Sequence, residues 1–279
     1  MEDCKTLKLL FLSLALLCAS CAAVSGSGCC QCTRNCGQCT PCENEEYNYF
    51  LFVVQWPATF CLKPGSCCDG SLTASNFTIH GLWPEKSKNC YPYCCGTEPF
   101  RPSEVSGLLP ELKTYWPSLA CHGTDDSFHA HEWIKHGTCS LASLPDPGTG
   151  TPVREYFQRT LQLRKSLPLL SILEQAEIYP SNTASYPLTK LTHAIKTAVG
   201  TFPDVQCTGA NINEVHFCLA KDLKTFIDCP TTLSTPEESQ HWMKDLSRRR
   251  HRKKPHPVPH GACPAQVKLP VLHSSSDVQ

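Results

Sequence analysis

The chain has 279 residues, with 25 basic side chains against 25 acidic ones, and 41% of its residues are hydrophobic. These values exclude an extended disordered chain, a coiled coil and a collagen-like fibre, and they suit one large globular domain or two small ones. The 21 cysteines are the outlier. Cytosolic thiols are kept reduced and seldom reach this density, so the composition predicts a disulfide-bonded protein of an oxidising compartment.

The N-terminus has the residue order of a secretory signal peptide. Lys5 and Lys8 precede the apolar run Leu9–Cys18, and small residues follow. Residues 1–25 are therefore predicted to be a signal peptide. The alternative is a membrane anchor, but the apolar stretch contains serines and is short for a span. The sequence favours a protein of the secretory pathway that has no contact with the membrane after cleavage.

Residues 26–46 are predicted to form a separate Cys-rich appendage, because they contain almost nothing apolar to bury. The six cysteines of this segment could bind a metal ion or form three disulfides of their own. An oxidising compartment favours the disulfides.

The composition changes at Tyr47 to that of a folded domain, which is predicted to extend over residues 47–272. The run YFLFVVQW at 49–56 predicts a buried central strand, and residues 79–83 predict a second strand. Helical spacing is found at 102–115, 129–138, 161–176 and 187–198, and a late strand pair is expected at 214–220 and 224–227. Helices between non-adjacent strands indicate an α+β domain with one antiparallel sheet.

The end of the chain departs again from this composition. Residues 231–260 are predicted to be a basic, Pro- and His-rich insertion, and residues 273–279 a C-terminal tail. The run SRRRHRKK at 247–254 has six Arg or Lys in eight residues, so the neutral total leaves −6 for the rest of the chain. Such a run could bind nucleic acid, but behind a signal peptide a solvated, protease-sensitive loop is the simpler interpretation.

Two segments combine His with aromatic and charged residues: FTIHGLWPEK at 77–86 and FHAHEWIKHGTCS at 128–140. If the second segment is helical, Glu132 and His136 share one face, and His131 and Lys135 pair one step round. A zinc site of the HExxH type is not formed, because Lys135 stands where the second His is required. This cluster of His, Glu and Lys side chains therefore suits the binding of an anion such as phosphate. That interpretation is favoured over a purely structural role for the histidines.

Two imidazoles and a lysine can cleave a phosphodiester without a metal or other cofactor. A neutral imidazole takes the proton from a ribose 2′-hydroxyl, and a protonated imidazole gives a proton to the departing 5′-oxygen. DNA lacks this hydroxyl, so the predicted substrate is single-stranded RNA and not DNA. Because one His must be neutral and the other charged, the rate is expected to be bell-shaped in pH, with an acidic optimum.

The two segments resemble the two active-site segments of the ribonuclease T2 family, as IHGLWPE at 79–85 and HEWIKHGTC at 131–139. Flanking pieces such as FVVQWPATFC, YWPSLAC and IDCP are similar too, and the resemblance covers residues 47–230. It implies an α+β domain with a central antiparallel sheet. It also implies metal-free RNA cleavage through a 2′,3′-cyclic phosphate, which is slowly hydrolysed to a 3′-phosphate.

The resemblance implies roles for individual residues. By this resemblance His80 is the general acid and His136 is the general base. His131 binds the phosphate, and Glu132 and Lys135 stabilise the transition state. Trp83 resembles the aromatic residue on which a base stacks. Gln55 and Phe128 lie where some members contact a second base.

Two positions depart from the family pattern, since His129 replaces a Trp and Glu85 replaces an Asp. Both departures are expected to affect the base preference of the enzyme rather than its chemistry.

The resemblance also implies disulfide pairs, which are Cys61–Cys67, Cys68–Cys121, Cys207–Cys263 and Cys218–Cys229. Cys139 is expected to pair with Cys90, Cys94 or Cys95, and the sequence does not choose among them. Asn76 begins the sequon Asn76-Phe77-Thr78 and is predicted to carry an N-linked sugar that points away from the active site.

The sequence therefore predicts a monomeric endoribonuclease, either secreted or held in a vacuolar or lysosomal lumen. The alternative is a catalytically weak or inactive binding or recognition protein on the same scaffold. His80 and His136 are both present together with Glu132 and Lys135, which favours the enzyme.

Overall fold

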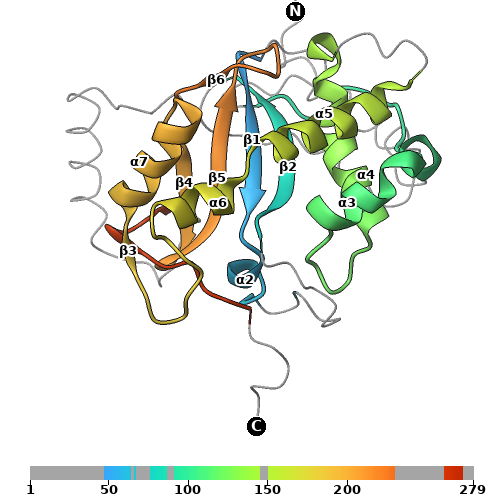
Figure 1. Ribbon diagram of the computed structural model, residues 1–279. Coiled ribbons are helices and arrows are strands. Elements are labelled where there is room, and N and C mark those ends of the chain that lie inside the picture. The colour runs from blue at the N-terminus through green and yellow to red at the C-terminus, as the bar shows by residue number, and fades with distance from the viewer. Residues whose placement is uncertain are drawn as a thin grey trace, which may run out of the picture.

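The central element of the computed structural model is an antiparallel sheet (Figure 1). The structure describes residues 47–63, 66, 76–86, 91–144, 150–229 and 261–272. Within these residues the strand order is β2-β1-β5-β4-β7, with β6 paired to β5. The strands are β1 Tyr49–Gln55, β2 Thr78–Glu85, β4 Asp204–Thr208, β5 Asn211–Leu219, β6 Phe226–Ile227 and β7 Gly261–Ala262. The predicted α+β class with a central antiparallel sheet is confirmed.

Several predicted segments lie outside the described residues. They are the signal peptide 1–25, the appendage 26–46, the insertion 231–260 with its basic run 247–254, and the tail 273–279. The predicted domain bounds stay predictions. A separate two-stranded pair joins β3 (Tyr186–Pro187) to β8 (Gln266–Val267).

Helices cover one face of the sheet. In Figure 1, α5 (Pro152–Ser166), α6 (Leu169–Gln175) and α7 (Leu188–Val199) lie across this face. Side chains alternate between the two faces of a strand, and Phe50, Phe52 and Val54 of β1 point to the helices and into the core. The opposite face of β1 carries the residues between them, so it is the face left for a functional site.

Two predicted helices have different bounds in the structure. The prediction of a single helix at 161–176 is wrong, because the helical conformation is interrupted at Leu167 between α5 and α6. Pro168 disfavours a helical conformation in the residue before it, which explains the break. The segment expected to be helical at 102–115 is a 3₁₀ helix, Pro102–Leu108, followed by α3, Leu109–Tyr115, which begins at the turn containing Pro110.

The sheet is tied to its surroundings by disulfides. Two of them, Cys207–Cys263 and Cys218–Cys229, are pairs that the family resemblance implies, and they leave from β4 and β5 respectively. Cys139 pairs with Cys95, out of the three candidates. Cys61 and Cys121 are also disulfide-bonded, but Cys67 and Cys68 lie outside the described residues, so the pairs Cys61–Cys67 and Cys68–Cys121 stay predictions.

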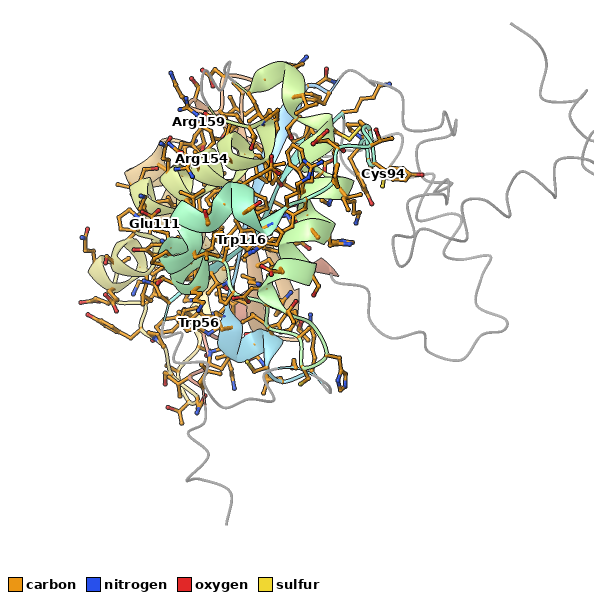
Figure 2. All side chains as sticks on the ribbon, turned by 90° about the vertical axis from the view of Figure 1, so that its right-hand side faces the viewer. Trp56, Cys94, Glu111, Trp116, Arg154 and Arg159 are labelled. Atoms are coloured by element: carbon orange, nitrogen blue, oxygen red, sulfur yellow. A yellow bond between two sulfur atoms is a disulfide. The ribbon has the colours of Figure 1, made fainter. Side chains whose placement is uncertain are left out.

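Side chains donate hydrogen bonds to backbone carbonyl oxygens of β2, which is the end strand of the sheet within the described residues. Trp116, which follows α3 (Figure 2), donates its indole N–H to the carbonyl oxygen of His80 over 3.0 Å. Tyr156 of α5 donates its hydroxyl proton to the carbonyl oxygen of Leu82 over 2.9 Å. Carbonyl groups at a buried sheet edge need hydrogen-bond donors. Here the donors are the side chains of Trp116 and Tyr156, and their hydrogen bonds hold β2 in place beside the site.

Arg164 of α5 fixes the beginning of β2 from inside the protein. Its guanidinium is buried and donates to the carbonyl oxygen of Phe77 over 2.8 and 3.1 Å. It also donates to the carbonyl oxygen of Leu167 over 3.1 Å and to the side-chain oxygen of Asn76 over 3.0 Å. One side chain therefore joins the entry to β2 to the corner between α5 and α6.

Replacing Arg164 by methionine should lower the free energy of unfolding by about 3 kcal/mol, because the buried carbonyls lose charged donors. The matched control is Arg159→Met on the same helix. Arg159 forms a partly exposed ion pair with Glu155 one helical turn away, and the loss of such a pair should cost less than about 1 kcal/mol. Urea unfolding of the oxidised proteins measures both values, and equal losses in the two variants would contradict the role given to Arg164.

Candidate active site

The site lies on the face of the sheet that α5, α6 and α7 do not cover. The strand register places its residues in cross-strand rows, because β1 pairs with β2 on one side and with β5 on the other. Leu51 faces Trp83 of β2, and Gln55 faces Glu214 of β5. Val53 faces both Gly81 of β2 and His216 of β5. These residues form the floor of the site.

A β-bulge turns His80 toward this floor. The register between β1 and β2 shifts between Val53 and Val54, so that Val53 faces Gly81 and Val54 faces Ile79. In regular alternation His80 would point to the same side as Leu82, which lies in the core. The extra residue lets Ile79 point into the core instead and leaves His80 on the site face, a common use of bulges near functional sites.

Helix α4, Asp125–Lys135, supplies the wall of the site next to β2. It begins at Thr124, whose side chain accepts a hydrogen bond from the backbone N–H of Ser127 in a capping box. It ends earlier than the expected helix at 129–138, because His136 leaves the helical conformation with φ −121°. A 3₁₀ turn, Gly137–Cys139, follows.

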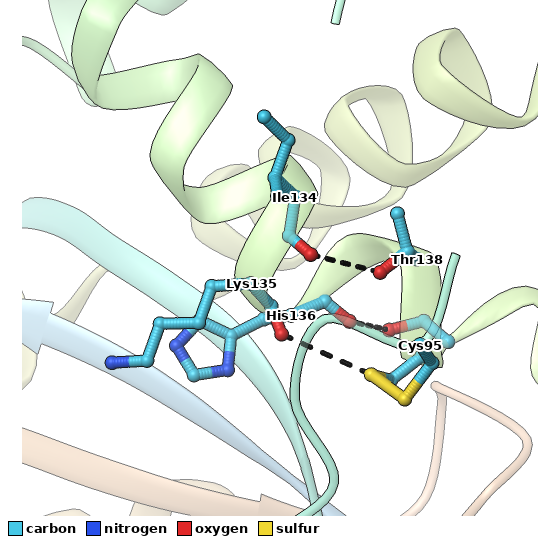
Figure 3. Close-up of a disulfide and its surroundings, with 7 residues drawn as sticks. Cys95, Ile134, Lys135, His136 and Thr138 are labelled. Carbon is cyan, nitrogen blue, oxygen red and sulfur yellow. Dashed lines mark hydrogen bonds between the residues drawn. A yellow bond between two sulfur atoms is a disulfide. The ribbon is translucent and has the colours of Figure 1, made fainter. Parts of the chain in front are cut away.

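The Cys95–Cys139 disulfide fixes the end of α4. The sulfur of Cys139 lies 3.8 Å from the carbonyl oxygen of Lys135, directly behind the turn. Figure 3 shows the side chains of Lys135 and His136 extending away from the disulfide on the same side of this turn. The disulfide therefore fixes the position of Lys135 and His136, the two residues of the second motif that lie at the end of the helix.

Trp83 connects the two motifs. Its indole N–H donates to the buried carboxylate of Glu132 over 2.8 Å. The ring of His136 stacks on the indole with centroids 5.0 Å apart, and the ring of His80 meets it edge-on at 4.9 Å. The two histidines of the predicted mechanism thus lie against one aromatic side chain.

The two imidazoles have opposite environments. His136 is buried, its Nδ1 has no hydrogen-bond partner among the described residues, and burial together with the charges of Lys135, His131 and His80 holds its pKa well below 6.5. Burial also acts to lower the pKa of His80. The hydrogen bond and charge of Glu214, with the charge of Glu132, outweigh that effect, so the pKa of His80 lies above 6.5.

Two residues of the site were not predicted from the sequence. Glu214 accepts a hydrogen bond from Nδ1 of His80 over 2.8 Å, and its second oxygen contacts Nε2 of His216 at 2.9 Å. The signal that could have found them is the segment 211–219, NINEVHFCL, in which two ionisable residues at positions i and i+2 share one face of an otherwise buried strand.

Two of the other predicted residues lie at the border of the site. Phe128 of α4 lies 6.2 Å from the ring of His80, centroid to centroid. Gln55 is buried, and its amide lies 3.4 Å from the carbonyl oxygen of Ile79. His131 is exposed on α4, and its charge acts on His136.

The two positions that depart from the family pattern are both buried, in different places. His129 lies in the core with Nε2 2.8 Å from the carbonyl oxygen of Trp116, among aromatic rings that include Phe157. It is therefore a core residue. Glu85 at the end of β2 has a carboxyl oxygen without a partner in the described part of the chain, and burial raises its pKa to about 8.

Among the described residues, no group of three or more His, Cys, Asp or Glu side chains has an arrangement suited to a metal ion. None of the helices described is both long and apolar enough to cross a membrane.

Comparison with known proteins agrees with this geometry. The model of the Ribonuclease T2 family matches residues 47–229. The chain is 36% identical over 195 residues to extracellular ribonuclease LE of Solanum lycopersicum, covering 67% of this chain and 82% of the relative. It is 34% identical over 196 residues to intracellular ribonuclease LX of the same plant, covering 67% and 79%.

Solved structures give the same result. RNase NT, whose structure was determined in complex with 5′-AMP, aligns with a TM-score of 0.63 and 32% identity, covering 81% of this chain and 99% of RNase NT. The chain therefore belongs to the ribonuclease T2 family and is a T2-type endoribonuclease.

Proposed function

We propose that this enzyme cleaves single-stranded RNA without a metal, by transesterification to 2′,3′-cyclic phosphates that are slowly hydrolysed to 3′-phosphates. His136 takes the proton of the 2′-hydroxyl, and His80 donates a proton to the departing 5′-oxygen. In the second step His80 takes a proton from water and His136 returns one to the 2′-oxygen. The observation that carries the proposal is the opposite environment of the two imidazoles, both of which lie against Trp83.

A general base must be neutral before the reaction, and a general acid must be protonated. The low pKa of His136 supports the first role, and the raised pKa of His80 supports the second. Pairs of titratable groups whose environments separate their pKa values in this way are typical of acid and base partners.

The remaining residues of the second motif suit a phosphate in transition. Lys135 supplies positive charge close to His80 and His136, whereas burial and the charges of Lys135 and His80 lower the pKa of His131. Burial raises the pKa of Glu132, although the charge of His80, the hydrogen bond from Trp83 and the charge of Lys135 oppose it. We assign phosphate binding to His131 and stabilisation of the phosphorane to Lys135 and Glu132, because charge develops on the phosphate oxygens in the transition state.

Base binding is assigned to Trp83, Gln55 and Phe128. Aromatic rings bind unstacked bases of single strands with little sequence preference, which favours single-stranded RNA over a duplex. The structure of RNase NT with 5′-AMP supports a nucleotide site on this scaffold. We propose that the enzyme acts as a monomer and does not cleave DNA, since DNA has no 2′-hydroxyl.

We place the enzyme in the secretory pathway, outside the cell or in a vacuolar or lysosomal lumen. The disulfides of the described residues support an oxidising compartment. Asn76 is exposed, and its side-chain oxygen accepts hydrogen bonds from the N–H of Phe77 and from Arg164. Because both bonds use the oxygen, they are compatible with an N-linked sugar on the amide nitrogen.

Cleavage of RNA in EDTA tests the chemistry. His80→Ala and His136→Ala should each lower kcat on a dinucleotide at least about 100-fold, because each removes a proton-transfer group. His193→Ala on α7, beyond the covered face of the sheet, is the control and should change kcat less than about twofold. Full activity of either site variant, cleavage of matched DNA, or loss of wild-type activity in EDTA would contradict the proposal.

The proposal also predicts a bell-shaped pH dependence of kcat/KM. Activity should fall toward acid as the pH drops through the low pKa of His136, because the base becomes protonated. Activity should fall toward alkali as the pH rises through the raised pKa of His80, because the acid loses its proton. Steady-state rates on a dinucleotide from pH 4 to 9 measure both limbs, and a rate that rises without an alkaline limb would exclude His80 as the acid.

Gly81 is required by the close approach of Trp83 and Glu132. A Cβ atom at this position would overlap Nε1 of Trp83 and Oε2 of Glu132, the two atoms that form their hydrogen bond. Position 81, directly after His80, must therefore lack a side chain for the two motifs to meet.

Gly81→Ala should lower kcat by about 100-fold, since small displacements of positioned groups have effects of this size. Gly107→Ala is the control, because its Cβ would meet only the flexible end of Arg154, at 3.3 Å. Unfolding measurements on both variants separate misplacement from unfolding. A folded Gly81→Ala variant with wild-type kcat would show that the contact between Trp83 and Glu132 is dispensable.

A further inference from the structure

Glu214 reaches the active site from a strand that does not neighbour the strand of His80. In the sheet, β1 lies between β5 and β2, and Gln55 of β1 faces Glu214 on one side and Thr78 on the other. The bulge in β2 displaces His80 from this register, and Glu214 reaches it across β1. The motifs around His80 and His136 contain neither Glu214 nor His216.

Each oxygen of the Glu214 carboxylate contacts a different imidazole. Oε1 accepts from Nδ1 of His80 over 2.8 Å, and Oε2 contacts Nε2 of His216 at 2.9 Å. The side chain of Glu214 is 16% exposed and that of His216 is 13% exposed, while His80 is 31% exposed. The carboxylate and its second partner are thus largely shielded from water, and His80 is the member of the group that faces outward.

We infer that Glu214 is a positioning residue that fixes the ring and the tautomer of His80, and that His216 fixes Glu214 in turn. This inference rests on the proposed function, in which His80 is the general acid. When Nδ1–H is donated to a carboxylate, the other ring nitrogen, Nε2, is the one that carries the transferable proton. Glu214 would therefore decide which nitrogen of His80 serves the leaving oxygen.

The charges around His80 on balance favour its protonated form. Glu214 approaches it from β5, and α4 supplies Glu132, which favours the imidazolium, and Lys135, which opposes it. Two further imidazoles, His131 and His136, interact electrostatically with His80.

Glu214 itself remains ionised. Burial acts to raise its pKa, but the hydrogen bonds from His216 and His80 outweigh burial and hold that pKa well below its ordinary value. The carboxylate is therefore present across the acid range in which the enzyme is expected to work.

The pH profile of kcat and kcat/KM in Glu214→Gln tests the inference. The variant keeps the size of the side chain but removes its charge. We expect kcat to fall about 10- to 100-fold with little change in KM, as for other partners that orient a functional histidine, and the alkaline limb to move to lower pH. His216→Gln keeps a donor to the second oxygen and should retain more activity than Glu214→Gln. Glu155→Gln removes a carboxylate from a partly exposed ion pair within α5, away from the site, and is the control whose kcat should be unchanged.

Unchanged kcat and an unchanged alkaline limb in Glu214→Gln would overturn the inference and leave Glu214 a structural residue. His80→Ala in the same assay separates this result from a failure of the proposed function. If His80→Ala is inactive and Glu214→Gln is normal, only the positioning role fails. If His80→Ala is active, the two-histidine mechanism fails as well.

Should Glu214→Gln not fold, the wild-type enzyme gives the answer. Proton–nitrogen correlation spectra of the imidazoles above the pKa of His80 report which ring nitrogen carries the proton. The inference predicts the tautomer protonated at Nδ1, and a tautomer protonated at Nε2 would overturn it.

Discussion

The pairing of β1 with two neighbours is the constraint on which the site depends. One face of this buried strand packs on the helices through Phe50, Phe52 and Val54, so the register of β1 cannot slip without moving these side chains out of the core. The same register brings β2 and β5 to either side of the opposite face. Residues separated by more than a hundred positions in the chain, such as His80 and Glu214, thereby come into hydrogen-bonding contact.

The site concentrates ionisable groups where burial makes them costly. His136 and Glu85 each have a polar atom without a partner in the part of the chain described, and the carboxyl of Glu132 is buried against an indole. Unpaired buried polar groups destabilise a fold. Here the same burial lowers the pKa of His136. A general base that works at acidic pH needs a low pKa, because it must be unprotonated before the reaction. The Cys95–Cys139 disulfide and the side chains that hold β2 supply rigidity next to these groups.

The two motif segments could be recognised from the sequence because each combines its reactive residues within a few positions. The fold class and the central strand followed from composition and from the run 49–56. Glu214 could not be assigned in this way, because its contact with His80 depends on strand register and on a one-residue bulge. The core position of His129 depends on packing against Trp116 and Phe157. Likewise, only the path of the chain before α4 decides that Cys139 pairs with Cys95.

One face of the sheet separates the pKa values of His80 and His136, and a direct titration of the two imidazoles tests this separation. Proton NMR of the imidazoles, assigned with single His variants, follows His80 and His136 in the wild-type enzyme from pH 4 to 9. We expect a pKa above the ordinary value of 6.5 for His80 and a pKa below it for His136. Equal values, or the reverse order, would contradict the assignment of acid and base.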